Sequence, residues 1–166
     1  MITIFVHQAG STRTADRIDP AWLDPASGVV VWVDLARPTQ DEGRLLSDVF
    51  HFHELSIQDA LSTVHHPKVE SYDDYLYLIL HGIDFQASRH KFATHDTDFF
   101  LGPTYLVTVH AGTTRSIGQI QALCAQNARV LSEGSTALLH RIVDTMVAHY
   151  RPEVDKLEHR LDTLED

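Results

Sequence analysis

Residues 138–166, LLHRIVDTMVAHYRPEVDKLEHRLDTLED, form a strongly patterned segment at the end of the chain. Apolar side chains recur there at alternating spacings of four and three, at Val143, Val147, Tyr150, Val154, Leu157, Leu161 and Leu164. This heptad spacing is typical of a long helix that packs along a second helix, and an ordinary amphipathic core helix is the alternative. Pro152 removes one backbone hydrogen bond inside the run, so we expect a kink there. The pattern predicts one long helix.

The end of this helix has no stop signal. The apolar repeat still runs at Leu164, and the chain stops at Asp166 without a glycine or asparagine cap or a cationic last turn. Helices that end within a domain often have such features. We therefore expect a fragment of a longer protein, in which residues 1–133 form an α/β domain and residues 134–166 begin a long helical arm.

The segments before the arm alternate between strand and helix patterns. Runs rich in Val, Ile, Tyr and Phe predict strands over residues 2–7, 28–35, 68–72, 74–83, 92–101 and 104–110. Helices are expected at residues 20–23, 54–61 and 115–131, and another opens at Thr39 with a capping box to Glu42. This order predicts an α/β (α+β) fold, a mixed, mostly antiparallel sheet flanked by short helices and followed by a long C-terminal helix. The expected core is Val31, Val33, Leu78, Leu80, Phe100, Val107 and Val109.

Composition excludes several classes of protein. The chain has 166 residues, one domain's length, and its 43% apolar and 22% charged residues are near globular averages. A formal net charge of −10 argues against nucleic-acid binding. The single cysteine, Cys124, excludes an internal disulfide and fits a reducing compartment. No run approaches the about 18 apolar residues of a membrane span, so we expect a soluble chain that does not itself enter the membrane.

Residues capable of catalysis or metal binding are present but do not form known motifs. Asp96 and Asp98 share one strand face, where we expect solvated side chains, and Cys124 fits a small buried hydrophobe within a helix. No nucleophile elbow, glycine-rich phosphate loop or His-Glu-x-x-His motif occurs. We therefore expect no enzyme activity, and a metal-dependent hydrolase that uses the histidines with Asp96 and Asp98 is the alternative. The histidines, expected to lie on the surface or cap helices, are His51, His53, His65, His66, His140 and His149.

Two motifs in the middle of the chain resemble a known family. Residues 52–60, FHELSIQDA, and 66–76, HPKVESYDDYL, are similar to the cytoplasmic domain of the CorA family of magnesium transporters. The hairpin 98–110, DFFLGPTYLVTVH, and the helix 138–166 are similar to later parts of the same domain. The family often has Glu where this chain has Gln58, and Arg where it has His66. The zinc-transporting, ZntB-like branch shares this architecture and remains open.

The resemblance implies a function and two metal sites. It implies a regulatory, ion-sensing domain of a divalent metal ion (Mg²⁺/Co²⁺) transporter, on the cytoplasmic face of the inner membrane. Asp59 would share Mg²⁺ with a stalk aspartate of the neighbouring subunit, and Asp144 would belong to a second regulatory site. Mg²⁺ keeps most of its waters and needs only one or two carboxylates, so such half-sites suit a sensor.

The resemblance also implies partners. They are the protein's own stalk and transmembrane helices, beyond residue 166, and four further subunits of a homopentamer. It requires no cofactor other than Mg²⁺ or another divalent cation as the regulatory ligand. The second alternative to the transporter is a free-standing adaptor that dimerises through residues 143–164.

Overall fold

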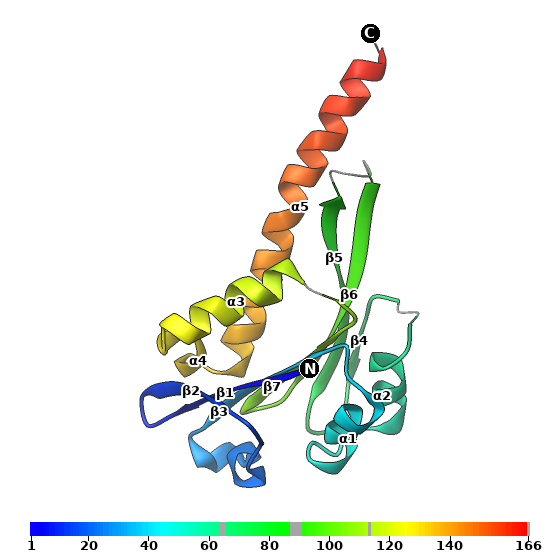
Figure 1. Ribbon diagram of the computed structural model, residues 1–166. Helices are drawn as coiled ribbons and strands as arrows, with labels where there is room; N and C mark the ends of the chain where they lie inside the picture. The colour runs from blue at the N-terminus through cyan, green and yellow to red at the C-terminus, as the bar shows by residue number, and fades with distance from the viewer. Residues whose placement is uncertain (64–65, 87–90, 113, 166) are drawn as a thin grey trace.

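The computed structural model describes residues 1–63, 66–86, 91–112 and 114–165. Within these ranges, seven strands form one sheet in the order β2-β1-β3-β7-β6-β5-β4 (Figure 1). β3 and β7 are parallel, and the other neighbouring pairs are antiparallel, which confirms the predicted mixed, mostly antiparallel sheet. The strands are β1 Ile2–Gln8, β2 Ser11–Ala15, β3 Val30–Ala36, β4 Lys68–Ser71, β5 Leu76–Gln86, β6 Lys91–Leu101 and β7 Tyr105–His110.

Helices join and flank these strands. They are the short 3-10 helices η1 Pro20–Leu23 and η2 Pro25–Ser27, then α1 Gln40–Asp48, α2 Glu54–Ala60, α3 Arg115–Gln126, α4 Arg129–Ser132 and α5 Ser135–Glu165. The capping box before α1 is present, because Glu42 N donates to Thr39 Oγ1 and Thr39 N donates to Glu42 Oε2. The single helix expected over residues 115–131 is instead two helices, since the backbone of Asn127 is extended.

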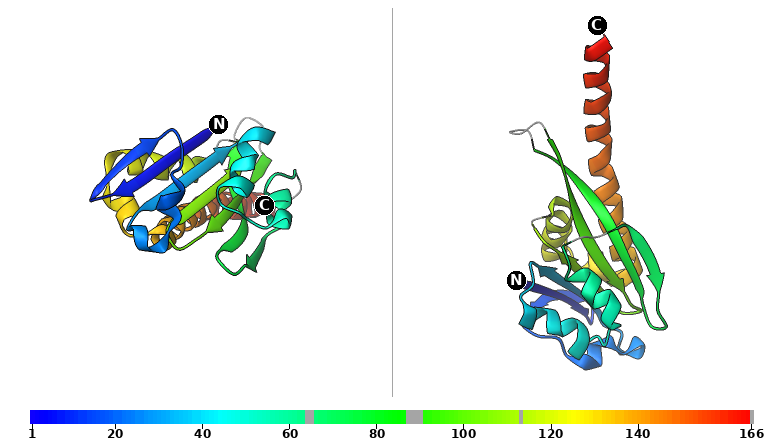
Figure 2. Two further views of the ribbon diagram at one scale, coloured as in Figure 1. Left: turned by 90° about the horizontal axis from the view of Figure 1, so that it is seen from below. Right: turned by 90° about the vertical axis from the view of Figure 1, so that its right-hand side faces the viewer.

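Each face of the sheet carries its own core. α1 and α2 pack on one face, over a cluster that includes Val31, Val33 and Val107. α3, α4 and α5 pack on the other face, over a cluster that includes Trp32 and Leu106 (Figure 2). Consecutive residues of β3 therefore lie in different cores, so this strand is buried on both faces of the sheet. The sheet thus separates the side chains of α2 from those of α5.

The predicted core is confirmed at five of its seven positions. Val31, Val33, Phe100, Val107 and Val109 are buried. Leu78 and Leu80 are only partly buried, although they pack against the cluster under α5. Both residues lie on β5, one strand from the edge of the sheet. On their face of the sheet α5 is the helix that packs against β5, and it covers these two side chains only in part.

α5 is partly core and partly projection. Along its first three turns, Leu138, Ile142 and Met146 are buried against the sheet. The C-terminal end of the helix extends away from the domain (Figure 1). The heptad seam lies elsewhere on the helix, with Val147 60% and Leu161 62% exposed. The helix continues through Pro152. In the described ranges, no helix is long and apolar enough to span a membrane.

Candidate functional site

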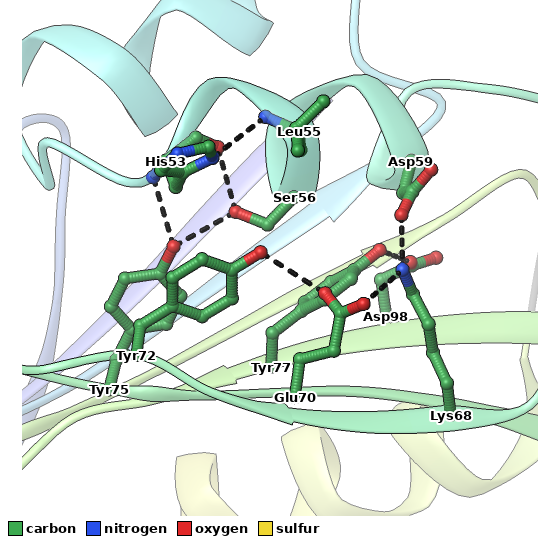
Figure 3. A network of polar contacts seen from close by, with 10 residues as sticks. All are labelled: His53, Leu55, Ser56, Asp59, Lys68, Glu70, Tyr72, Tyr75, Tyr77 and Asp98. Carbon is green, nitrogen blue, oxygen red and sulfur yellow. Dashed lines mark hydrogen bonds and ion pairs between the residues drawn. The ribbon is translucent and has the colours of Figure 1, made fainter.

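The first predicted metal ligand, Asp59, lies on α2, and a polar network fixes this short helix over the sheet. His53 caps its N-terminus, because Leu55 N donates to His53 Nδ1 over 3.2 Å. The hydroxyl of Ser56 donates to the His53 carbonyl (2.8 Å), and the Tyr75 hydroxyl lies 2.9 Å from both His53 N and Ser56 Oγ (Figure 3). Tyr75 follows β4, so these bonds attach α2 to the β4–β5 connection. The expected capping role of His53 is confirmed.

The carboxylate of Asp59 faces a lysine rather than open solvent. Lys68 Nζ donates to Asp59 Oδ2 and also to Glu70 Oε1, the latter at 2.9 Å (Figure 3). The Tyr72 hydroxyl donates to the second Glu70 oxygen over 3.1 Å. All three charged side chains are partly exposed. Leu55 and Ser71 complete the lining of a surface depression of about 440 Å³ here. Two carboxylates thus already hold one cation, the lysine ammonium.

The surroundings keep this lysine charged. Hydrogen bonds to Asp59 and then Glu70 raise the pKa of Lys68 above its ordinary value, against the effect of burial. Lys68 Nζ also lies 5.5 Å from the centroid of the Tyr77 ring, at cation–π distance. Behind it, the Tyr77 hydroxyl donates to the carboxylate of Asp98, and burial with the nearby Asp98 charge raises the pKa of Tyr77. The site is a compact acidic surface with an internal counter-ion.

The second predicted ligand, Asp144, lies far from this network in the fold. It is exposed on α5, which packs on the face of the sheet opposite α2. The chain therefore does not bring Asp59 and Asp144 together. Among the described residues, no three His, Cys, Asp or Glu side chains gather closely enough to hold a metal ion. Metal binding at Asp59 and at Asp144 stays a prediction.

The other candidates have structural explanations. Asp98 is 2% exposed, so the expectation of a solvated side chain was wrong: it lies under α2 on a central strand, where Tyr77 satisfies it. Asp96 is partly buried, with Oδ1 3.2 Å from His81 Nε2. Cys124 is buried as expected, and burial raises the pKa of its thiol to about 12. His65 lies outside the described residues.

Sequence reasoning missed two charged groups of partners. Lys68 and Glu70 belong to the motif at residues 66–76, but no function was predicted for them. Their spacing of two residues places both side chains on one face of a strand. The pair of Asp34 and His110 was also missed. An aspartate inside the apolar strand Val30–Ala36 was the available signal, because a buried carboxylate needs a partner.

Comparisons with known proteins agree with the sequence motifs. A family model described as "CorA-like Mg2+ transporter protein" matches residues 27–166. YfjQ of Bacillus subtilis (strain 168), named as a candidate metal ion transporter, is 32% identical over 135 residues, covering 81% of this chain. This chain spans 41% of that relative's length.

Solved structures share the fold. The soluble domain of CorA from Methanocaldococcus jannaschii superposes with a TM-score of 0.77 at 22% identity, covering 98% of this chain and 63% of that one. The ZntB cytoplasmic domain from Vibrio parahaemolyticus RIMD 2210633 superposes with a TM-score of 0.70 at 18% identity, covering 97% and 63%. The two likenesses confirm the predicted fold class. Since the CorA and ZntB domains share this fold, the fold alone does not distinguish one from the other.

Proposed function

Because this chain belongs to the CorA family of Mg²⁺ transporter proteins, we propose that it is the cytoplasmic, ion-sensing domain of a divalent metal ion transporter. The pore then lies in the remainder of the protein, which agrees with a match to only 41% of its relative's length. The family is one of transporters and not of enzymes, so the hydrolase alternative loses its support.

The observation that favours sensing is the cation already held between Asp59 and Glu70. The partly exposed carboxylates of Asp59 and Glu70 lie around the Lys68 ammonium, which supports a role for this surface of α2 and β4 in binding positive charge. In the proposed assembly, a carboxylate from a neighbouring subunit approaches Asp59, and Mg²⁺ with most of its waters lies between them. Asp144 is exposed and serves a second such contact from α5. Filled sites hold the subunits together, and emptied sites let the carboxylates repel.

Gating then follows as a population shift between a filled and an empty state. Carboxylate oxygens are hard ligands that suit Mg²⁺ better than they suit softer metals, so we assign Mg²⁺, with Co²⁺ as a second transported ion. The subunits form a homopentamer on the inner membrane through the rest of the chain. A domain of this kind needs no cofactor beyond the regulatory cation.

The test uses the full-length protein in membranes. Limited proteolysis across a Mg²⁺ series measures the midpoint at which this domain becomes protected. We expect Asp59→Ala to move that midpoint to higher Mg²⁺, because one ligand between subunits is gone. Asp41→Ala is the matched control, since Asp41 is exposed on α1 and pairs only with its neighbour Arg44 at 3.4 Å in the described structure. Superimposable curves for wild type and Asp59→Ala would remove Asp59 from the sensor.

A further inference from the structure

A separate crevice lies where the two parallel strands end. Ala36, the last residue of β3, pairs with His110, the last residue of β7. The chain leaves β3 toward α1 on one face of the sheet and leaves β7 toward α3 on the other (Figure 1). In open sheets, such a divergence of neighbouring parallel strands opens a crevice outside their carboxyl ends, and ligands bind there.

Two adjoining cavities occupy this position. One, of about 420 Å³, lies on the α3 side, and its lining includes Asp34, Thr114 and Gln121. The other, of about 780 Å³, lies on the α2 side. Arg37 and His110 line both, so the two cavities meet at the strand ends. Their sizes are those of small-molecule sites, roughly 300–1,000 Å³.

A buried ion pair forms the floor of the smaller cavity. Asp34 is 3% exposed and His110 is 6% exposed. His110 Nε2 lies 3.1 and 3.3 Å from the two Asp34 oxygens, and His110 Nδ1 contacts the Gly112 carbonyl. Thr108 Oγ1 and Gln121 Nε2 also donate to Asp34. Because both ring nitrogens face oxygen acceptors, the protonated imidazolium is the form of the ring that satisfies both contacts.

Around the smaller cavity the charges leave an excess of positive charge at Arg37, whereas the carboxylate of Asp96 lines the larger cavity. Burial opposes protonation of His110, but the hydrogen bond and charge of Asp34 outweigh it and raise its pKa. His110 and Asp34 therefore neutralise each other. The Met1 ammonium at the rim is offset by Glu42, 3.0 Å away. Arg37 is exposed, and its Nε donates to the Ala111 carbonyl, which anchors the guanidinium at the junction of the cavities.

Thr114 gives an independent indication of a ligand. It is 3% exposed on the wall of the smaller cavity, and within the described residues its hydroxyl oxygen has no hydrogen-bond partner. A buried hydroxyl without a partner carries an energetic cost. Arg37 also adopts a positive φ of 47°, a strained backbone that is common at binding sites.

We propose that this crevice binds a small molecule through a phosphate or carboxylate group, which Arg37 contacts directly and Thr114 hydrogen-bonds. The Asp34–His110 pair, neutral overall, holds the floor of the site in place. The guanidinium fork matches either group by two parallel hydrogen bonds. This site lies at the strand ends, apart from Asp59, and does not depend on the sensing role proposed above.

The experiment is isothermal titration calorimetry of the full-length protein with inorganic phosphate, AMP and citrate at constant ionic strength in chloride buffer. We expect saturable binding of at least one probe, about tenfold weaker in Arg37→Gln because a charge-assisted contact is lost. Thr114→Val, which keeps the side-chain shape, should also bind more weakly. Arg44→Gln, an exposed arginine on α1 outside the crevice, should bind as wild type does.

The three probes distinguish the sources of the anion. Binding of phosphate and AMP but not citrate assigns the site to phosphate groups, and binding of citrate alone assigns it to carboxylates. Circular dichroism of each variant confirms that it is folded. Absence of saturable binding for all three probes, or equal affinity in wild type and Arg37→Gln, would overturn the proposal.

Discussion

Replacing Lys68 by methionine should strengthen divalent-cation binding at the Asp59 surface. Lys68 Nζ donates to one oxygen of Asp59 and lies 2.9 Å from one oxygen of Glu70, so it occupies the position between the two carboxylates. A divalent cation that binds either carboxylate must displace this ammonium or tolerate it nearby. Methionine keeps the apolar part of the side chain against Tyr77 and removes only the charge.

The size of the effect follows from Coulomb's law. A charge of +2 about 5 Å from a charge of +1 is destabilised by about 1.7 kcal/mol in a medium with the dielectric constant of water, the appropriate choice for partly exposed groups. Removing the ammonium therefore tightens Mg²⁺ binding about 15-fold. The substitution also removes two partly exposed ion pairs, which stabilise the fold by about 0.2–1 kcal/mol each.

The assay is the Mg²⁺-dependent protease protection of the full-length protein. We expect Lys68→Met to move the midpoint to about 15-fold lower Mg²⁺. The double variant Lys68→Met with Asp59→Asn should lose that gain. Lys156→Met is the control, because Lys156 lies on α5 and pairs with Glu153, on the other face of the sheet. A midpoint for Lys68→Met that is unchanged, or displaced to higher Mg²⁺, would refute the reasoning that the lysine competes with the cation.

Three further predictions concern the 166-residue chain itself. The pKa of His110 is raised in the folded state, so its pair with Asp34 stabilises the fold fully at pH values below the ordinary pKa of 6.5. This stabilisation is lost as the pH rises through the folded-state pKa. The difference in unfolding free energy between wild type and His110→Gln should therefore shrink as the pH rises. Ile142→Ala should cost about 2–5 kcal/mol in urea unfolding and Val154→Ala less than about 0.5, since the first is buried and the second is 55% exposed; equal costs would contradict the described core. Calorimetry should show Mg²⁺ binding no tighter than millimolar order, because each proposed site is half built; micromolar binding lost in Asp59→Ala would contradict this.

Local signals predicted most of the elements. Thr39 and Glu42 are three residues apart and cap α1 through their own side chains, so no distant contact is needed. β2 was missed because its sequence, STRTA, has no apolar alternation, and it pairs with β1 at the sheet edge. The break at Asn127 was also missed. Its side chain accepts a hydrogen bond from Arg129 N, a local competitor of the helix that apolar spacing does not reveal.

The candidate sites are formed by contacts between elements that are distant in the sequence, and local sequence patterns do not predict such contacts. Asp59 was identified by its motif, but its partner Lys68 lies on a different element, and only the packing of α2 over β4 brings them together. Asp34 and His110 are 76 residues apart and meet because β3 and β7 are parallel neighbours in register. The spacing of residues along the sequence does not predict that β3 and β7 pair, because several helices and strands lie between them in the chain.

The C-terminal helix carries two apolar stripes, and the sheet covers only one of them. Leu138, Ile142 and Met146 are spaced by four and face the sheet, whereas the heptad positions begin at Val143, one residue around the helix. Both stripes are apolar near the start of α5, so the spacing alone could not decide which one the sheet covers. Beyond Met146 the stripe that faces the sheet becomes polar at the buried Glu153, which Lys156 neutralises. The heptad stripe remains apolar and exposed at Val147, Val154 and Leu161. The apolar heptad repeat therefore predicted the length of the helix. The change from apolar to polar side chains along the stripe that faces the sheet shows where the apolar contact with the sheet ends.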